Sequence, residues 1–163
     1  MATMGVMAHE LGHDLSMPDL YDTTPPGNFD SEGVGEWSIM SSGNWNYVSG
    51  YHGTSPAYLD AFLKSYQGWL TPTNVSGTLN NQSIAEAETN AVAYRLRPNP
   101  GGVDWEFHSH SGTGEYFLVE NRQLIGYDAG LPGCGLLIWH IDESVSYGND
   151  ANGDENHALV WLE

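Results

Sequence analysis

Two histidines and a glutamate near the start of the chain have the types and spacing of a metal-dependent hydrolase. Residues 9–13 read HELGH and fit the pattern H-E-x-x-H. Side chains four residues apart lie on the same face of a helix, so His9 and His13 can bind one zinc ion. Zinc lowers the pKa of a coordinated water to about 7, and Glu10 would accept its proton as the water attacks a peptide carbonyl. The pattern therefore predicts a zinc peptidase site with Glu10 as general base.

A third ligand is expected because a catalytic zinc ion takes three protein ligands and keeps one position open. Asp19 follows His13 by six residues and fits the longer pattern in which the chain turns after the helix and returns to the metal. Histidine is the usual residue there, and a carboxylate is equally acceptable to zinc. The pattern has glycine where this chain has Ser16, and a left-handed serine costs on the order of 1 kcal/mol. We predict that Asp19 completes the site.

Three other carboxylates compete for the role of third ligand. Glu32 and Glu36 would serve in a thermolysin-type arrangement, which uses two histidines and a glutamate. Their glycine-rich surroundings argue against the downstream helix that such a ligand needs. Asp22 is nearer to Asp19 in the sequence than either glutamate and is the stronger competitor. As an alternative to binding the metal, it would orient a ligand histidine through a hydrogen bond.

The elements that must position these residues follow from hydrophobic periodicity. Residues 4–15 predict the helix of the motif, because Val6, Met7, Leu11 and Leu15 recur at helical spacing. A second helix is expected over 56–67, beginning at a proline. Between them, residues 36–46 are expected to form a compact turn around Met40 that resembles the methionine turn beneath the zinc of metzincins. Strands are expected at 92–98, 115–122, 135–142 and the C-terminus.

An α+β fold follows from this order of elements, with helices around the metal and an antiparallel sheet after them. We expect one partial peptidase domain over 1–163. Its helical part covers 1–70 and its β-rich part covers 71–163. The motif begins at the ninth residue and the last residues read as a strand, so both ends indicate a piece of a larger protein.

Composition excludes several classes of protein. Four Lys and Arg residues stand against 21 Asp and Glu, and a net charge of −17 argues against nucleic-acid binding. No apolar run is long enough to span a membrane. Cys134 is the single cysteine, which excludes an intrachain disulfide and a thiolate zinc site. The acidity suits hard cations such as calcium, although a solvated acidic surface is sufficient to explain it.

Two further patterns are weaker metal candidates. Residues 149–157, NDANGDENH, alternate oxygen side chains like the start of a calcium loop, but they lack the glycine and glutamate of an EF-hand. A polar turn accounts for them as well. His108 and His110 fit a surface loop better than a metal site.

Four segments together resemble the immune inhibitor A family of secreted bacterial metallopeptidases. They are HELGHDLSMPDLYD, GEWSIMSSGNWN, SPAYLDAFLKSYQGWLTP and EYFLVENRQLIGYDAGLPGCGLLIWHID. The resemblance implies the C-terminal part of a metzincin-like catalytic domain, zinc at His9, His13 and Asp19, protein or peptide substrates, secretion, and calcium as a structural ion. Serralysin-type relatives have a tyrosine two residues after the turn methionine, where this chain has Ser42. A truncated, catalytically silent module for binding or structure is the alternative interpretation.

Overall fold

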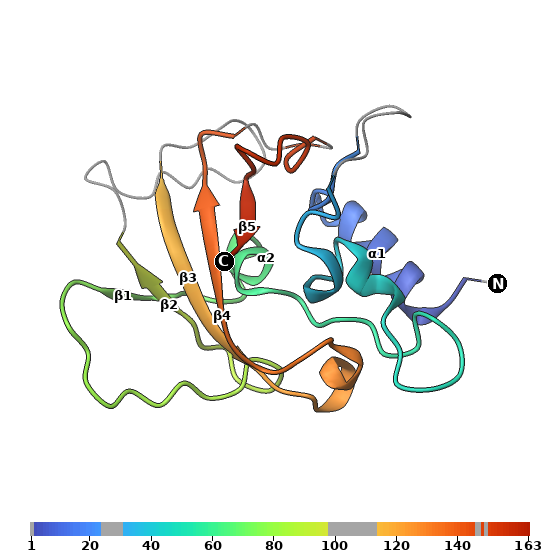
Figure 1. Cartoon of the computed structure of the whole chain (residues 1–163), viewed down its shortest axis with the longest axis horizontal. Coiled ribbons are helices and arrows are strands. Elements are labelled where there is room, and N and C mark those ends of the chain that lie inside the picture. Colours follow the sequence, from blue (N-terminus) through green and yellow to red (C-terminus); the bar gives the residue numbers. More distant parts are fainter. Residues whose placement is uncertain (1, 24–30, 98–113, 146–147, 149) are drawn as a thin grey trace.

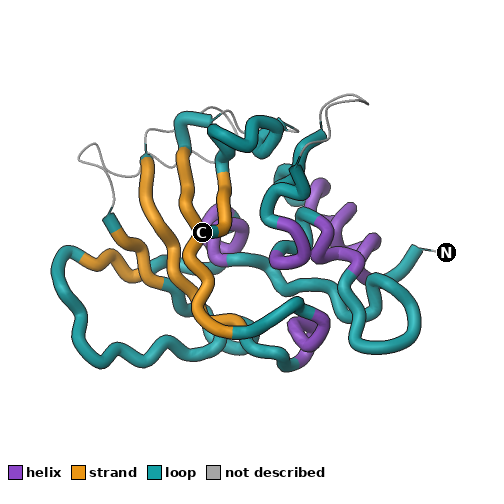
Figure 2. Tube along the Cα trace, in the orientation of Figure 1, coloured by secondary structure: helices purple, strands orange, loops and turns teal. Residues whose placement is uncertain are grey.

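The computed structural model describes residues 2–23, 31–97, 114–145, 148 and 150–163. Within these ranges, helices gather near the N-terminus and strands follow, as Figures 1 and 2 show. The helices are α1 (Met4–Asp14) and α2 (Ala61–Tyr66), with the 3₁₀ helices η1 (Gly35–Trp37), η2 (Ser42–Trp45) and η3 (Gly126–Gly130). The strands are β1 (Thr73–Val75), β2 (Tyr94–Leu96), β3 (Glu115–Arg122), β4 (Gly135–Asp142) and β5 (Val160–Leu162). The expected α+β class is confirmed, and His108 and His110 lie outside the described residues.

The five strands form one sheet in the order of the sequence, from β1 to β5. The pairs β2–β3, β3–β4 and β4–β5 are antiparallel, and β3 and β4 pair along their whole length, from Glu115 with Asp142 to Arg122 with Gly135. The expectation of a purely antiparallel sheet is wrong at one edge, because β1 and β2 run parallel. The 18 residues between those two strands let the chain return to the same edge in the same direction.

Helix α2 joins the helical part of the chain to the sheet. It contacts β3 and β4, and one continuous hydrophobic cluster contains Phe62 and Leu63 from the helix with Leu118 and Trp139 from the strands. The helix begins at Ala61, not at Pro56 as the sequence suggested. Asp60 caps it by accepting a hydrogen bond from the backbone N–H of Leu63 at 2.8 Å, so the helix starts where this cap satisfies a free donor.

The apolar face of α1 does not pack against the hydrophobic core. The helix forms as predicted, but Met7 is 64% exposed and Leu11 is 57% exposed, whereas the buried helix residues are Gly5, His9 and Gly12. Leu11 and Leu15 instead line an apolar pocket of about 340 Å³. Helical spacing correctly predicted the helix, but the face that it buries carries the metal motif.

Among the described residues, none of the helices combines the length and the apolar character that a membrane span requires.

Candidate metal centre

The end of α1 turns the chain back toward its own histidines. Ser16 has φ 63°, its N–H donates to the His13 carbonyl at 2.8 Å, and the N–H of Met17 donates to Gly12 at 2.9 Å. These two bonds form a Schellman motif, in which the left-handed position is usually glycine. The predicted left-handed turn at Ser16 is therefore confirmed, and it directs the following residues toward Asp19.

Backbone carbonyls hold both imidazoles in one orientation. The Nδ1 atom of His9 lies 2.8 Å from the carbonyl oxygen of Ile39, and Nδ1 of His13 lies 3.0 Å from that of Met17. A carbonyl oxygen only accepts hydrogen bonds, so each Nδ1 carries the proton of the neutral ring. The Nε2 atoms are consequently lone-pair acceptors, which is the form that binds a metal ion.

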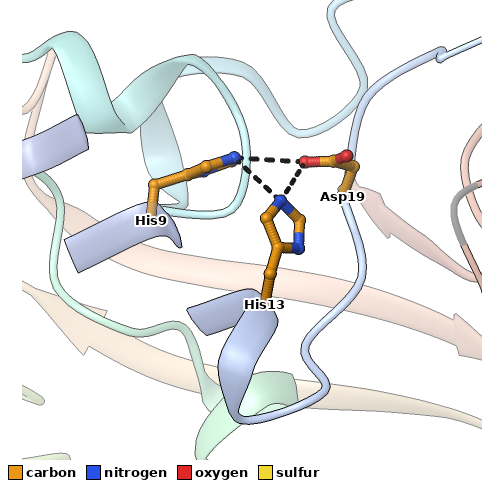
Figure 3. Close-up of side chains that lie close together, drawn as sticks. All are labelled: His9, His13 and Asp19. Carbon is orange, nitrogen blue, oxygen red and sulfur yellow. Dashed lines mark hydrogen bonds and ion pairs between the residues drawn. The ribbon is translucent and has the colours of Figure 1, made fainter. Parts of the chain in front are cut away.

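Three acceptor atoms converge at one point, as Figure 3 shows. Nε2 of His9 and Nε2 of His13 lie 3.2 Å apart, and each lies 3.3 Å from Oδ1 of Asp19. This oxygen is buried and has no hydrogen-bond donor, because both facing nitrogens are themselves acceptors in the assigned tautomer. Lone pairs that point at one another are unfavourable unless a cation lies among them.

The triangle has the dimensions of one face of a zinc tetrahedron. Zinc binds imidazole nitrogen and carboxylate oxygen at about 2.0–2.2 Å, so ligand atoms at tetrahedral angles are about 3.3–3.6 Å apart. The donor set of two imidazoles and one carboxylate is also acceptable for zinc. Among the described residues, this is the one group of three or more His, Cys, Asp or Glu side chains whose ligand atoms lie within 4.8 Å of one another. The residues therefore fit the metal that the motif predicts.

The local charges favour a cation. Without metal, the pKa of His9 is raised, chiefly because the protonated ring can donate a hydrogen bond to Asp19, and this effect outweighs the lowering caused by burial. The Ile39 carbonyl and the charges of Asp19 and Glu10 raise it further. Glu10 is exposed on α1 beside the buried His9, and its carboxylate acts electrostatically on His9 and on Tyr21. The acid–base candidate therefore lies close to the ligands without belonging to the group.

Met40 lies beneath the helix that carries the motif. Its side chain is fully buried, and a Cβ atom added to Gly12 would lie 2.4 Å from the Met40 sulfur. The glycine between the ligand histidines thus allows the turn to approach the helix closely. The turn predicted around Met40 is present, flanked by η1 and η2.

The competing carboxylates do not join the ligand group. Glu32 and Glu36 are exposed, and Asp22 is buried, but of the described carboxylates only Asp19 lies with the two histidines. The sequence did not indicate Tyr21, whose hydroxyl hydrogen-bonds to Asp19. The pKa of Tyr21 is raised by burial and then by the charge and the hydrogen bond of Asp19. Its position two residues after Asp19 was the only available signal, because the contact depends on the fold of the loop.

The calcium prediction gains no support from the loop after β4. The side chain of Asn152 is buried, donates to the carbonyls of Leu20 and Val160, and accepts from the Val160 N–H. Asp154 accepts a hydrogen bond from the backbone N–H of Asn156. These oxygens therefore stabilise the loop backbone rather than converge on an ion.

The segment that carries the site is similar in sequence to known proteins. Residues 1–72 match the family model described as the immune inhibitor A peptidase M6 catalytic domain. The chain is 48% identical over 65 residues to the pre-pro-metalloprotease PrtV of Vibrio cholerae, which is 40% of this chain and 7% of PrtV. It is 39% identical over 88 residues to immune inhibitor A of Bacillus thuringiensis subsp. alesti, which is 52% of this chain and 12% of that protein.

The segment with the converging histidines is thus similar to part of the catalytic domain of a metallopeptidase. Residues 1–72, less than half of the chain, are similar in sequence to the immune inhibitor A-like family. The matched regions span only 7% and 12% of the two relatives.

Proposed function

We propose that the chain is part of a zinc-dependent endopeptidase that hydrolyses peptide bonds of protein substrates. The observation that carries this proposal is the convergence of three acceptor atoms, from His9, His13 and Asp19, on a point that has no donor. We assign these residues as zinc ligands, Glu10 as the general base, and Met40 as the support beneath the helix.

Different residues of the chain would carry out different steps of the hydrolysis. A zinc ion at the site would supply Lewis-acid activation of a water molecule. Glu10 would accept a proton from the attacking water as the new C–O bond forms, and would return it to the leaving nitrogen as the C–N bond breaks. Asp19 would be held in its liganding position by the Tyr21 hydroxyl.

We further propose that residues 1–163 form one partial domain of metzincin-like type, with 1–70 carrying the site and 71–163 supporting it. The hydrophobic cluster that joins Met40 and Phe62 to Trp139 supports this division of roles. The family resemblance supports an extracellular location and protein or peptide substrates.

Hydrolysis of an unfolded protein tests the proposal directly. The chain is incubated with denatured casein after zinc loading, after chelation, and after return of zinc to the chelated sample. We expect cleavage that disappears on chelation and returns with zinc. A folded, zinc-loaded chain that cleaves nothing would favour the alternative of a silent module for binding or structure.

A further inference from the structure

The turn at residues 38–41 positions two of the three ligand residues at once. The carbonyl oxygen of Ile39 accepts from Nδ1 of His9 at 2.8 Å. The next carbonyl, that of Met40, accepts from the backbone N–H of Leu20 at 2.8 Å, directly after Asp19. Two successive peptide groups therefore set the position of His9 and of the segment that bears Asp19.

A buried hydrogen-bond chain fixes this turn. The Ser38 hydroxyl accepts from the N–H of Met40 at 3.2 Å and donates to Oδ2 of Asp60 at 2.6 Å. Both side chains are fully buried, and Oδ1 of Asp60 caps α2 through Leu63. The turn is thus connected to the helix that contacts the sheet.

We propose that Ser38, held by its hydrogen bond to Asp60, is a positioning residue of the metal centre. Through the turn, it keeps His9 and Asp19 in a fixed position relative to α2. The inference rests on the proposed zinc function and adds a residue that touches neither metal nor substrate. Nothing in the H-E-x-x-H pattern requires a serine two residues before the turn methionine.

The energetic argument follows from burial. Without the Ser38 hydroxyl, the Met40 N–H loses its acceptor and Oδ2 of Asp60 loses its donor, both in the protein interior. Each unpaired buried group costs about 1–3 kcal/mol, and the turn relieves this cost by moving. Such a movement displaces the Ile39 carbonyl, and loss of a group that orients a ligand lowers metal affinity by about 10–100-fold.

Zinc affinity of Ser38→Ala in the whole chain, measured by competition with a chromophoric chelator, tests the inference. Ser65→Ala is the matched control, because the Ser65 hydroxyl is also buried but has no hydrogen-bond partner among the described residues. We expect affinity to fall at least about tenfold in Ser38→Ala and to stay within about twofold of wild type in Ser65→Ala. The visible spectrum of the Co²⁺-substituted protein should change in Ser38→Ala alone, since it reports coordination geometry.

Metal-free thermal unfolding separates positioning from simple loss of fold. If Ser38→Ala does not unfold cooperatively, Asp60→Asn replaces it. This variant keeps an acceptor for Leu63 but presents an amide donor to Ser38, so the Ser38 hydroxyl loses the carboxylate that fixes its orientation, and zinc affinity is expected to fall. Wild-type zinc affinity in whichever of these variants folds would overturn the inference and leave the proposed function intact. A wild-type chain that binds no zinc would overturn both.

Discussion

The Nδ1 atom of His9 lies 2.8 Å from the carbonyl oxygen of Ile39. This bond joins the motif helix to the turn that contains Met40, two elements 30 residues apart in the sequence. Because the carbonyl accepts only, it also selects the tautomer whose Nε2 is free to bind metal.

Glu10→Ala should separate metal binding from hydrolysis. The exposed carboxylate lies beside the ligands but outside the group, so the variant should keep its zinc. Loss of a general base should lower peptide hydrolysis by about 10²–10⁴-fold. Asp14→Ala, which removes an exposed carboxylate one turn further along α1, is the control and should retain activity. Proteolysis at the wild-type rate in Glu10→Ala would exclude the proposed mechanism.

Ser16→Gly should stabilise the chain. Ser16 has φ 63° at the end of α1, where glycine avoids the strain of the side chain. The free energy of unfolding, from urea titration, should rise by up to about 1 kcal/mol. Ser16→Ala keeps the strain and removes the hydroxyl, so it should not stabilise. Equal stabilisation by both variants would show that the backbone strain is not the cause.

The stability gained from zinc should increase with pH. In the metal-free chain the pKa of His9 is raised above 6.5 by Asp19. Protonated His9 and Asp19 therefore contribute to the free energy of unfolding below pH 6.5, and this contribution is lost as pH rises through the raised pKa of His9. Zinc needs the neutral ring and competes with the proton. The rise in melting temperature on adding zinc should be larger at about pH 8 than at about pH 5.5. An equal rise at both values would contradict liganding by His9.

Arg122→Ala should strongly destabilise the fold. The guanidinium of Arg122 is fully buried and pairs with Asp128 at 2.6 Å. It also donates to the carbonyls of Trp37 and Tyr58, which ties β3 to the segments around the turn. Removing one partner of a buried ion pair costs about 3–5 kcal/mol, measured by urea unfolding.

The control for this change is Arg97→Ala, because Arg97 is exposed and its loss should change stability by about 0.5 kcal/mol or less. If both variants changed the free energy of unfolding by similarly small amounts, the buried pair of Arg122 and Asp128 would not be what stabilises this part of the fold.

Patterns of neighbouring residues in the sequence were sufficient to predict the features that depend on neighbouring residues, such as strands, the motif helix and the turn after it. The strands at 115–122 and 135–142 have the bounds that the sequence suggested. The metal motif lies on a helix, and Ser16 takes the left-handed conformation that the longer pattern requires. The spacing of His9, His13 and Asp19 was sufficient to predict which residues converge.

The sequence could not show features that depend on distant partners. The apolar residues of α1 suggest a buried face, but their exposure depends on what the fold brings to that side of the helix. The parallel pairing of β1 with β2 depends on the path of the intervening chain. The hydrogen bond from Ser38 to Asp60 joins residues 22 positions apart, and neither residue belongs to a recognisable motif.

Zinc stoichiometry of the purified chain tests the central claim most directly. Elemental analysis would be made on wild type, on Asp19→Ala, and on Asp22→Ala, which removes the nearest competing carboxylate. The proposed site predicts one zinc ion per wild-type chain, a loss in Asp19→Ala, and full occupancy in Asp22→Ala. A folded wild-type chain without zinc, or zinc that survives in Asp19→Ala and is lost in Asp22→Ala, would contradict the ligand set.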